Sequence, residues 1–161
     1  MNAKGPFLEG MVADFLRHCR TGDPALEPAA MAVTRMTFTA TPEEQWRMVL
    51  EAVRQARDDF DLACIAVGPV EGLLGKHGEK VIDRAETVAL SDLGFLRMLT
   101  GVTKHSMSEE VWERVESLRA TVNEPLQVTD VQMGRLQDER IRFEEELLRQ
   151  VNERLNELEE P

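Results

Sequence analysis

Between residues 41 and 101 the sequence repeats one pattern: a residue able to cap a helix, then apolar residues at helical spacing, then a residue that stops the helix. The clearest case begins at Thr41, which can accept a hydrogen bond from a free backbone N–H, with Pro42 at the first helical position and Glu44 completing a capping box. The apolar residues that follow share one helix face: Trp46, Val49, Leu50 and Val53. This pattern predicts an all-α fold in which Trp46 is a core anchor rather than a binding platform.

The segments after this helix are expected to continue the same organisation. Residues 60–67 are almost continuously apolar, which fits a buried strand or a buried helix, and their alanine content and helical neighbours favour a helix. Gly68 and Pro69 are predicted to end that helix. Gly78 is expected to end a short helix that follows, and Ser91 to cap the next one.

The glycines of this region do not form a nucleotide-binding motif. A phosphate-binding loop ending at Gly75-Lys76 needs glycine at position 70 and serine or threonine at position 77, but the chain has Val70 and His77. The spacing of a dinucleotide fingerprint is absent as well. We expect Gly72 and Gly75 instead to let neighbouring backbones approach closely.

The N-terminal part adds shorter helices to the bundle. Residues Pro6–Arg20 are predicted to form the first helix, with His18 near its C-terminal end, where a cation suits the helix dipole. Residues Ala29–Met36 are expected to form a short helix. Thr37–Thr39 is interpreted as an extended entry to the helix capped by Thr41. The bundle as a whole fits either HEAT-like hairpins or a compact orthogonal arrangement.

A boundary is predicted after the helix that Ser108 caps. Asn123 and Pro125 break the apolar pattern over residues 122–129, so we expect a helical domain at residues 1–121 and, at residues 122–161, a linker with a long amphipathic helix.

The long C-terminal helix is predicted to begin at Asp130. One apolar stripe on it consists of Met133, Leu136, Phe143, Leu147, Val151 and Leu158, and beside it Ile141, Leu148 and Leu155 repeat every seven residues. Gln137 and Glu144 interrupt a strict heptad, so the helix either folds back on the core or forms an imperfect coiled coil. An unpartnered stripe would be an exposed apolar surface, and we therefore predict a homodimer through Asp130–Glu160.

One stretch, GPVEGLLGKHGEKVIDRAE, carries a resemblance to a known family. Its matching positions are Gly68, Pro69, Glu71, Leu73, Leu74, His77, Gly78, Ile82, Asp83 and Glu86. The chain over roughly residues 11 to 120 resembles an uncharacterised bacterial all-helical domain family of unknown function, with Gly-Pro-Leu-Glu-x-Leu-Leu, His-Gly and Ile-Asp-x-x-Glu elements; Val70 and Gly72 depart from that pattern. The resemblance implies an all-helical fold and does not point to any activity.

Composition limits the classes of function and location. The formal net charge of −11 argues against nucleic-acid binding, which needs clustered lysine and arginine, and it permits a basic protein partner. Cys19 and Cys64 form no CxxC pair, so we expect two small buried hydrophobes rather than a disulfide or a zinc site. No apolar run is long enough for a membrane span, no signal peptide is apparent, and the cytoplasm is the predicted location.

The candidate functional cluster is Glu71, His77, Asp83 and Glu86, because these residue types can do acid–base chemistry or bind a divalent metal. The spacing is common by chance, and no HExxH, GxSxG or Cys–His pattern accompanies it. We therefore predict a non-enzymatic protein–protein interaction module without a cofactor, in a sharper version an acidic immunity- or inhibitor-like protein. The alternative is an enzyme or metal-binding module centred on the cluster.

Overall fold

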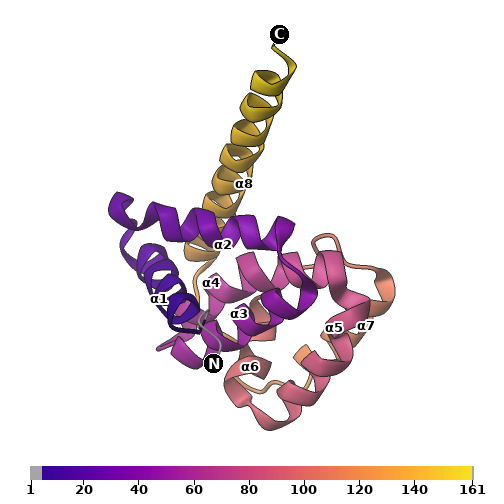
Figure 1. The fold of residues 1–161 in the computed structure, drawn as a ribbon. Coiled ribbons are helices and arrows are strands. Elements are labelled where there is room, and N and C mark those ends of the chain that lie inside the picture. The colour runs from indigo at the N-terminus through magenta and orange to yellow at the C-terminus, as the bar shows by residue number, and fades with distance from the viewer. Residues whose placement is uncertain (1–4, 161) are drawn as a thin grey trace.

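The computed structural model describes residues 5–160, whose secondary structure is helical (Figure 1). The α-helices are α1 (Gly5–Thr21), α2 (Glu27–Thr39), α3 (Pro42–Gln55), α4 (Asp59–Ile65), α5 (Glu71–Ser91), α6 (Leu93–Met98), α7 (Glu109–Arg119) and α8 (Asp130–Glu159). Single turns of tighter or wider helix lie at Pro24–Leu26 (3-10), Ala66–Val70 (π) and Leu99–Gly101 (3-10). The predicted fold class is confirmed: short helices form a compact body, and a long C-terminal helix follows.

The helix starts follow from the caps that the sequence predicts. The Thr41 hydroxyl accepts from the backbone N–H of Glu44 at 3.1 Å, and the Glu44 carboxylate accepts from the N–H of Thr41 at 3.3 Å, which closes the capping box. Ser108 caps α7 as predicted. The cap of α6 is Asp92 rather than Ser91, because α5 continues through Ser91.

The core centres on α4 and the π turn that follows it, where nearly every residue is buried. Trp46 on α3 is 8 % exposed, and its ring meets Phe95 of α6 edge to face, with 5.9 Å between ring centroids. Trp46 is therefore a core anchor, as predicted. Cys19 and Cys64 are also buried and unpaired, which confirms that they pack as small hydrophobes.

The predicted stop at Gly68 and Pro69 is wrong, because the chain passes from α4 through the π turn directly into α5. The N–H of Glu71 donates to the carbonyls of Ala66 and Gly68, which closes this turn. A π turn tolerates a residue that has no backbone N–H to donate. Pro69 therefore does not interrupt the helical path from α4 to α5. Glu71 is consequently carried into the core.

Two further predicted interruptions are absent. The segment Thr37–Thr39 is part of α2 rather than extended, and hydroxyls of this segment donate to carbonyls of the preceding turn. Gly78 does not end a helix: α5 kinks at His77 (φ −128°, ψ 20°) and then continues. Gly78 serves close packing instead, since a Cβ there would lie 2.9 Å from a methyl group of Val111 on α7.

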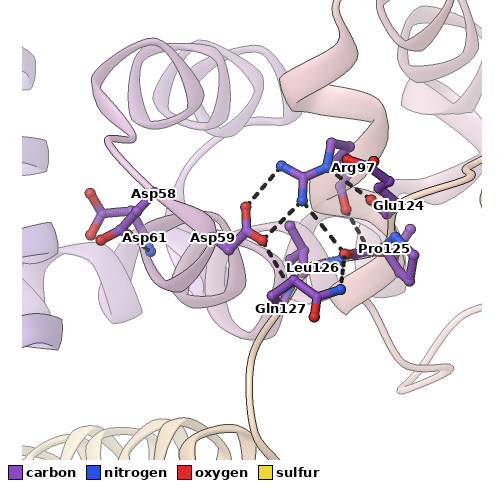
Figure 2. Close-up of polar contacts among 9 residues, drawn as sticks. Asp58, Asp59, Asp61, Arg97, Glu124, Pro125, Leu126 and Gln127 are labelled. Atoms are coloured by element: carbon purple, nitrogen blue, oxygen red, sulfur yellow. Dashed lines mark hydrogen bonds and ion pairs between the residues drawn. The ribbon is translucent and has the colours of Figure 1, made fainter.

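An ion pair fixes the linker between α7 and α8. Figure 2 shows Arg97 of α6 donating to both carboxylate oxygens of Asp59 on α4, at 2.8 and 2.9 Å. The same guanidinium donates to the carbonyl of Glu124 at 2.9 Å, and Asp59 accepts from the backbone N–H of Gln127 at 2.8 Å (Figure 2). The linker therefore has a defined path, which sets where α8 begins.

Helix α8 divides into a packed half, residues 130–147, and a free half, residues 148–159. The packed half lies against α2 and the π turn and buries Leu136, Phe143 and Leu147. From residue 148 onward every described residue is exposed, and Figure 1 shows this part standing clear of the body. At about 1.5 Å per residue the whole helix is about 45 Å long. The packed half adopts the folded-back alternative, and the coiled-coil alternative stays a prediction for the free half.

The packed half changes the environment of the predicted helix-end cation, His18. This residue is 2 % exposed, and its ring meets Phe143 of α8 edge to face with 5.4 Å between centroids. His18 does lie near the end of α1, as predicted, and α8 covers it there, which the sequence did not predict. Among residues 5–160, no helix is both long enough and apolar enough to cross a membrane.

The Asp59–Arg97 pair generates a pH-dependent prediction. Hydrogen bonds from Arg97 and then from the Gln127 backbone lower the pKa of Asp59 from its ordinary value of 3.8. A lowered pKa in the folded state gives stability that is present above the unfolded value and lost as the pH falls through the folded value. We expect Asp59→Asn to lower the free energy of unfolding by about 1–3 kcal/mol at pH 7, with a smaller loss below pH 3.8.

The neighbouring residue supplies the control for this prediction. Asp58 caps α4 by accepting from the N–H of Asp61, and asparagine caps helices about as well as aspartate. Asp58→Asn should therefore leave stability nearly unchanged in urea titrations at both pH values. Equal losses in the two variants, or a loss for Asp59→Asn that does not depend on pH, would contradict the assignment.

Candidate functional site

The structure brings only two of the four predicted cluster residues together. Asp83 and Glu86 on α5 both accept hydrogen bonds from Arg114 of α7. Asp83 is exposed and Glu86 is half-buried. This is a surface ion pair between two packed helices, and such pairs contribute little to stability.

His77 lies at the kink of α5, in a shallow hollow formed with the segment that leads into α7. It is half-buried, and among residues 5–160 its ring makes no hydrogen bond to the other three residues of the cluster. The kink lies at His77 itself, after which α5 continues through Asp83 and Glu86. His77 therefore shares α5 with the ion pair but takes no part in its hydrogen bonds.

Glu71 is the buried member of the cluster. Its side chain is fully buried, and one carboxylate oxygen accepts from the backbone N–H and the hydroxyl of Thr103 at 2.8 and 2.9 Å. The other oxygen forms an ion pair with Arg140 of α8, which also donates to the carbonyl of Val67 at 3.0 Å. Burial raises the pKa of Glu71 above its ordinary value, while the bonds from Thr103 and the charge of Arg140 oppose that rise.

These positions give no geometric support to a metal centre at the cluster. No three His, Cys, Asp or Glu side chains in the part of the chain that the structure describes lie close enough to hold a metal ion. Glu71 already has its hydrogen-bond partners inside the protein. The four residues of the cluster therefore do not form an assembled site that would support the enzyme or metal-binding alternative.

The most prominent surface feature is instead the free half of α8. Its exposed large apolar side chains are Leu148, Val151, Leu155 and Leu158, and Ile141 precedes Leu148 by about two turns on the same helix. Successive spacings of three and four residues place Leu148 and Leu155 at the a positions, and Val151 and Leu158 at the d positions, of two heptads. Glu144 occupies the preceding d position, so the apolar seam begins at Leu148.

The seam faces a different direction from the buried stripe of the packed half. An α-helix turns by about 100° per residue, which places the centre of the seam about a quarter turn away from Leu136, Phe143 and Leu147. A partner on the seam would therefore lie beside the body rather than against it. The seam is accessible over the full length of the free half.

Sequence reasoning located the α8 stripe but not the residue that anchors it. Arg140 looked like one more charge on a solvated helix face, yet only 16 % of its side chain is exposed, because it reaches the buried Glu71. The sequence did carry one signal, which is Glu71 in an otherwise apolar segment. If such a carboxylate is buried, it requires a charged or hydrogen-bonding partner. The sequence alone does not show which of its 19 lysines and arginines supplies it.

The pairing of Glu71 with Arg140 yields a test of what holds α8 on the body. Glu71→Gln and Arg140→Gln should each lower the free energy of unfolding by about 3 kcal/mol, because each leaves a largely buried charge without its partner. The double variant should lose at least about 1 kcal/mol less than the sum of the single losses. Urea denaturation of the four proteins measures this coupling.

Arg149→Gln is the matched control, because Arg149 pairs with Glu146 and Glu153 on the exposed surface of the same helix. We expect a loss below about 1 kcal/mol. Strictly additive losses for Glu71 and Arg140 would show that the pair does not hold α8 in place.

Comparison with known proteins identifies the body of this structure. A model of a family of unknown function, DUF6869, matches residues 21–122, from the end of α1 to the start of the linker. No curated protein and no solved structure matches the chain. HEAT-like packing and a bacterial origin accordingly stay predictions. The expected resemblance to an uncharacterised domain family is confirmed, and the chain belongs to the family of unknown function DUF6869.

Proposed function

We propose that this protein is a non-enzymatic protein–protein interaction module and that the free half of α8 is its binding surface. The observation that carries this proposal is a two-heptad apolar seam on a helix that stands clear of the body (Figure 1). An isolated helix of this length is marginal in water, but here the packed half already nucleates it. The free half thus presents a preformed helix to a partner.

The partner that the seam fits best is a second copy of the chain. In a parallel pair, Arg154 at a g position meets Glu159 of the second copy at an e position. The two-fold symmetry of the dimer gives two such ion pairs. In an antiparallel pair of the same two heptads, the two Arg154 side chains meet each other, and Glu145 meets Glu159. Charge complementarity therefore supports a parallel homodimer.

The position of the body permits this arrangement. Because the seam is about a quarter turn from the buried stripe, a two-fold axis along the seam places the two bodies on opposite sides of the helix pair. Two heptads form an interface below the standard size, so we expect a dissociation constant in the range of about 1–100 μM.

Other partners and the location of the protein stay predictions. The net charge of −11 is compatible with a basic protein partner, as an immunity- or inhibitor-like protein would have. Such a partner would use the acidic body surface rather than the apolar seam. The cytoplasm remains the compartment that we predict for this acidic chain.

The first test measures molar mass by light scattering over a range of concentrations. We expect the full chain to approach twice its 18.2 kDa mass at high concentration, and Leu155→Glu to remain at one chain, because a charge would be desolvated in the seam. Leu90→Glu is the matched control, since Leu90 is 85 % exposed on α5 and should not affect association. A full chain that stays at one chain at every concentration would remove the homodimer proposal.

A second test determines the orientation of the helices. Arg154→Glu should weaken the parallel dimer about threefold to tenfold by placing glutamate opposite Glu159 of the second copy, and the added change Glu159→Arg should restore it. In an antiparallel dimer the same Arg154→Glu change would replace an arginine–arginine contact with a glutamate–glutamate contact, so association would stay nearly unchanged. Sedimentation equilibrium at low salt distinguishes a weakened dimer from an unchanged one.

A further inference from the structure

A cavity of about 210 Å³ lies beneath the packed half of α8, between α1, α2 and the start of α5. Its walls are mainly apolar and include Phe15, Val33 and Phe143. The cavity is independent of the seam on the free half. It adjoins the hollow at His77, with which it shares Gly75, Lys76 and Ser106, and its lining does not include Asp83 or Glu86.

Glycines shape the wall that α5 contributes. A Cβ at Gly72 would lie 3.1 Å from Thr37 of α2, and a Cβ at Gly75 would lie 3.1 Å from Ser106. Larger residues would push these segments apart, which confirms the predicted role of the two glycines in close approach. Close packing on this side leaves the open space under α8 rather than between α5 and its neighbours.

Polar groups with unused hydrogen-bonding capacity line the same cavity. The Nε of Arg140 is buried and has no hydrogen-bond partner, although a carboxylate oxygen of Glu144 lies 3.7 Å away. His18 also lines this cavity and is 2 % exposed. Buried polar groups nearly always have a partner, so their position on a cavity wall indicates a bound molecule or water.

Lys76 adds a cation at the same wall. Its ammonium group donates to the carbonyl of Thr37 at 2.8 Å and lies 3.6 Å from the centroid of the Phe38 ring. No carboxylate in the described part of the chain lies within ion-pair distance of it. Burial lowers the pKa of Lys76, and the charge of Glu144 opposes this effect. An anion in the cavity would complete the coordination of this ammonium group.

We propose that the cavity binds a small apolar carboxylate, with its carboxylate near Lys76 and Arg140 and its apolar part against Phe15 and Phe143. A cavity of about 150 Å³ holds a benzene molecule, so this one has room for a ring or a branched chain with a short acid group, about ten non-hydrogen atoms in all. Glu71 also lies on the cavity wall, and the charge of Arg140 together with the hydrogen bonds from Thr103 offsets its negative charge. This inference goes beyond the interaction function and does not depend on it.

The experiment titrates the full chain with phenylacetate by isothermal calorimetry and compares the neutral phenylacetamide and the cationic phenethylamine. We expect phenylacetate to bind with a dissociation constant below about 1 mM and to raise the melting temperature, the amide to bind at least tenfold more weakly, and the amine not to bind. Absence of binding by all three compounds would mean that the cavity holds water only. Equal or tighter binding of the amide or the amine would overturn the assignment of an anion site.

Variants of two lysines on α5 locate the site. Lys76→Gln should weaken phenylacetate at least about fivefold, because it removes the ammonium group at the cavity wall. Lys80→Gln is the matched control, since Lys80 is exposed on the same helix outside this cavity. Both side chains reach solvent, so both variants should keep the circular dichroism of the parent chain. Phenylacetate binding that is unaffected by Lys76→Gln, or equally weakened by both changes, would contradict the proposed position of the carboxylate.

Discussion

The burial of the Glu71 carboxylate is the constraint on which the placement of α8 depends. A carboxylate withdrawn from water is strongly unfavourable unless hydrogen bonds and an opposite charge replace its hydration. Thr103 supplies two hydrogen bonds from the loop before α7, and Arg140 supplies the charge from α8. Glu71 therefore joins the π turn, the loop and the C-terminal helix at one point. Since Arg140 lies outside the residues that match the family, the family-matched body completes its buried polar group with a residue from a neighbouring segment.

Helix α8 shows how one amphipathic helix can serve two purposes in succession. Its packed half places apolar residues against α2 and the π turn, while its free half places a second apolar seam about a quarter turn away. If one apolar stripe ran along the whole of α8, either the body would have to cover the full length of the helix, or the full length would have to pair with another helix. The change of direction near residue 148 separates the apolar face that packs on the body from the apolar face that we propose binds a partner. The linker clamp of Asp59 and Arg97 fixes the start of this helix, so the direction in which the free half projects is set by the body (Figure 2).

Local signals predicted the helices well, and long-range contacts account for what sequence reasoning missed. Caps at Thr41 and Ser108 and the apolar face of Trp46 involve residues within two turns, so their patterns are legible in the sequence. The π turn at Pro69 depends on the packing of the core around it, which overrides the usual effect of proline. The burial of His18 and the pairing of Glu71 depend on α8, which lies far away in sequence. The candidate cluster failed to assemble for a local reason: a kink at His77, which spacing along α5 does not show, lies between Glu71 and the pair of Asp83 and Glu86.

The cavity and the seam share α8 but are energetically separable. A ligand in the cavity could change dimerisation only if it bound two positions of α8 with different affinity. The packed half is held by the Glu71–Arg140 pair and by Arg135, which donates to the carbonyl of Cys19 at 2.7 Å. These contacts lie on the wall side of the helix, whereas the seam begins beyond them at Leu148. We therefore expect a ligand that bonds to the unpaired Nε of Arg140 to leave the pair between Arg140 and Glu71, and with it the position of the free half, unchanged.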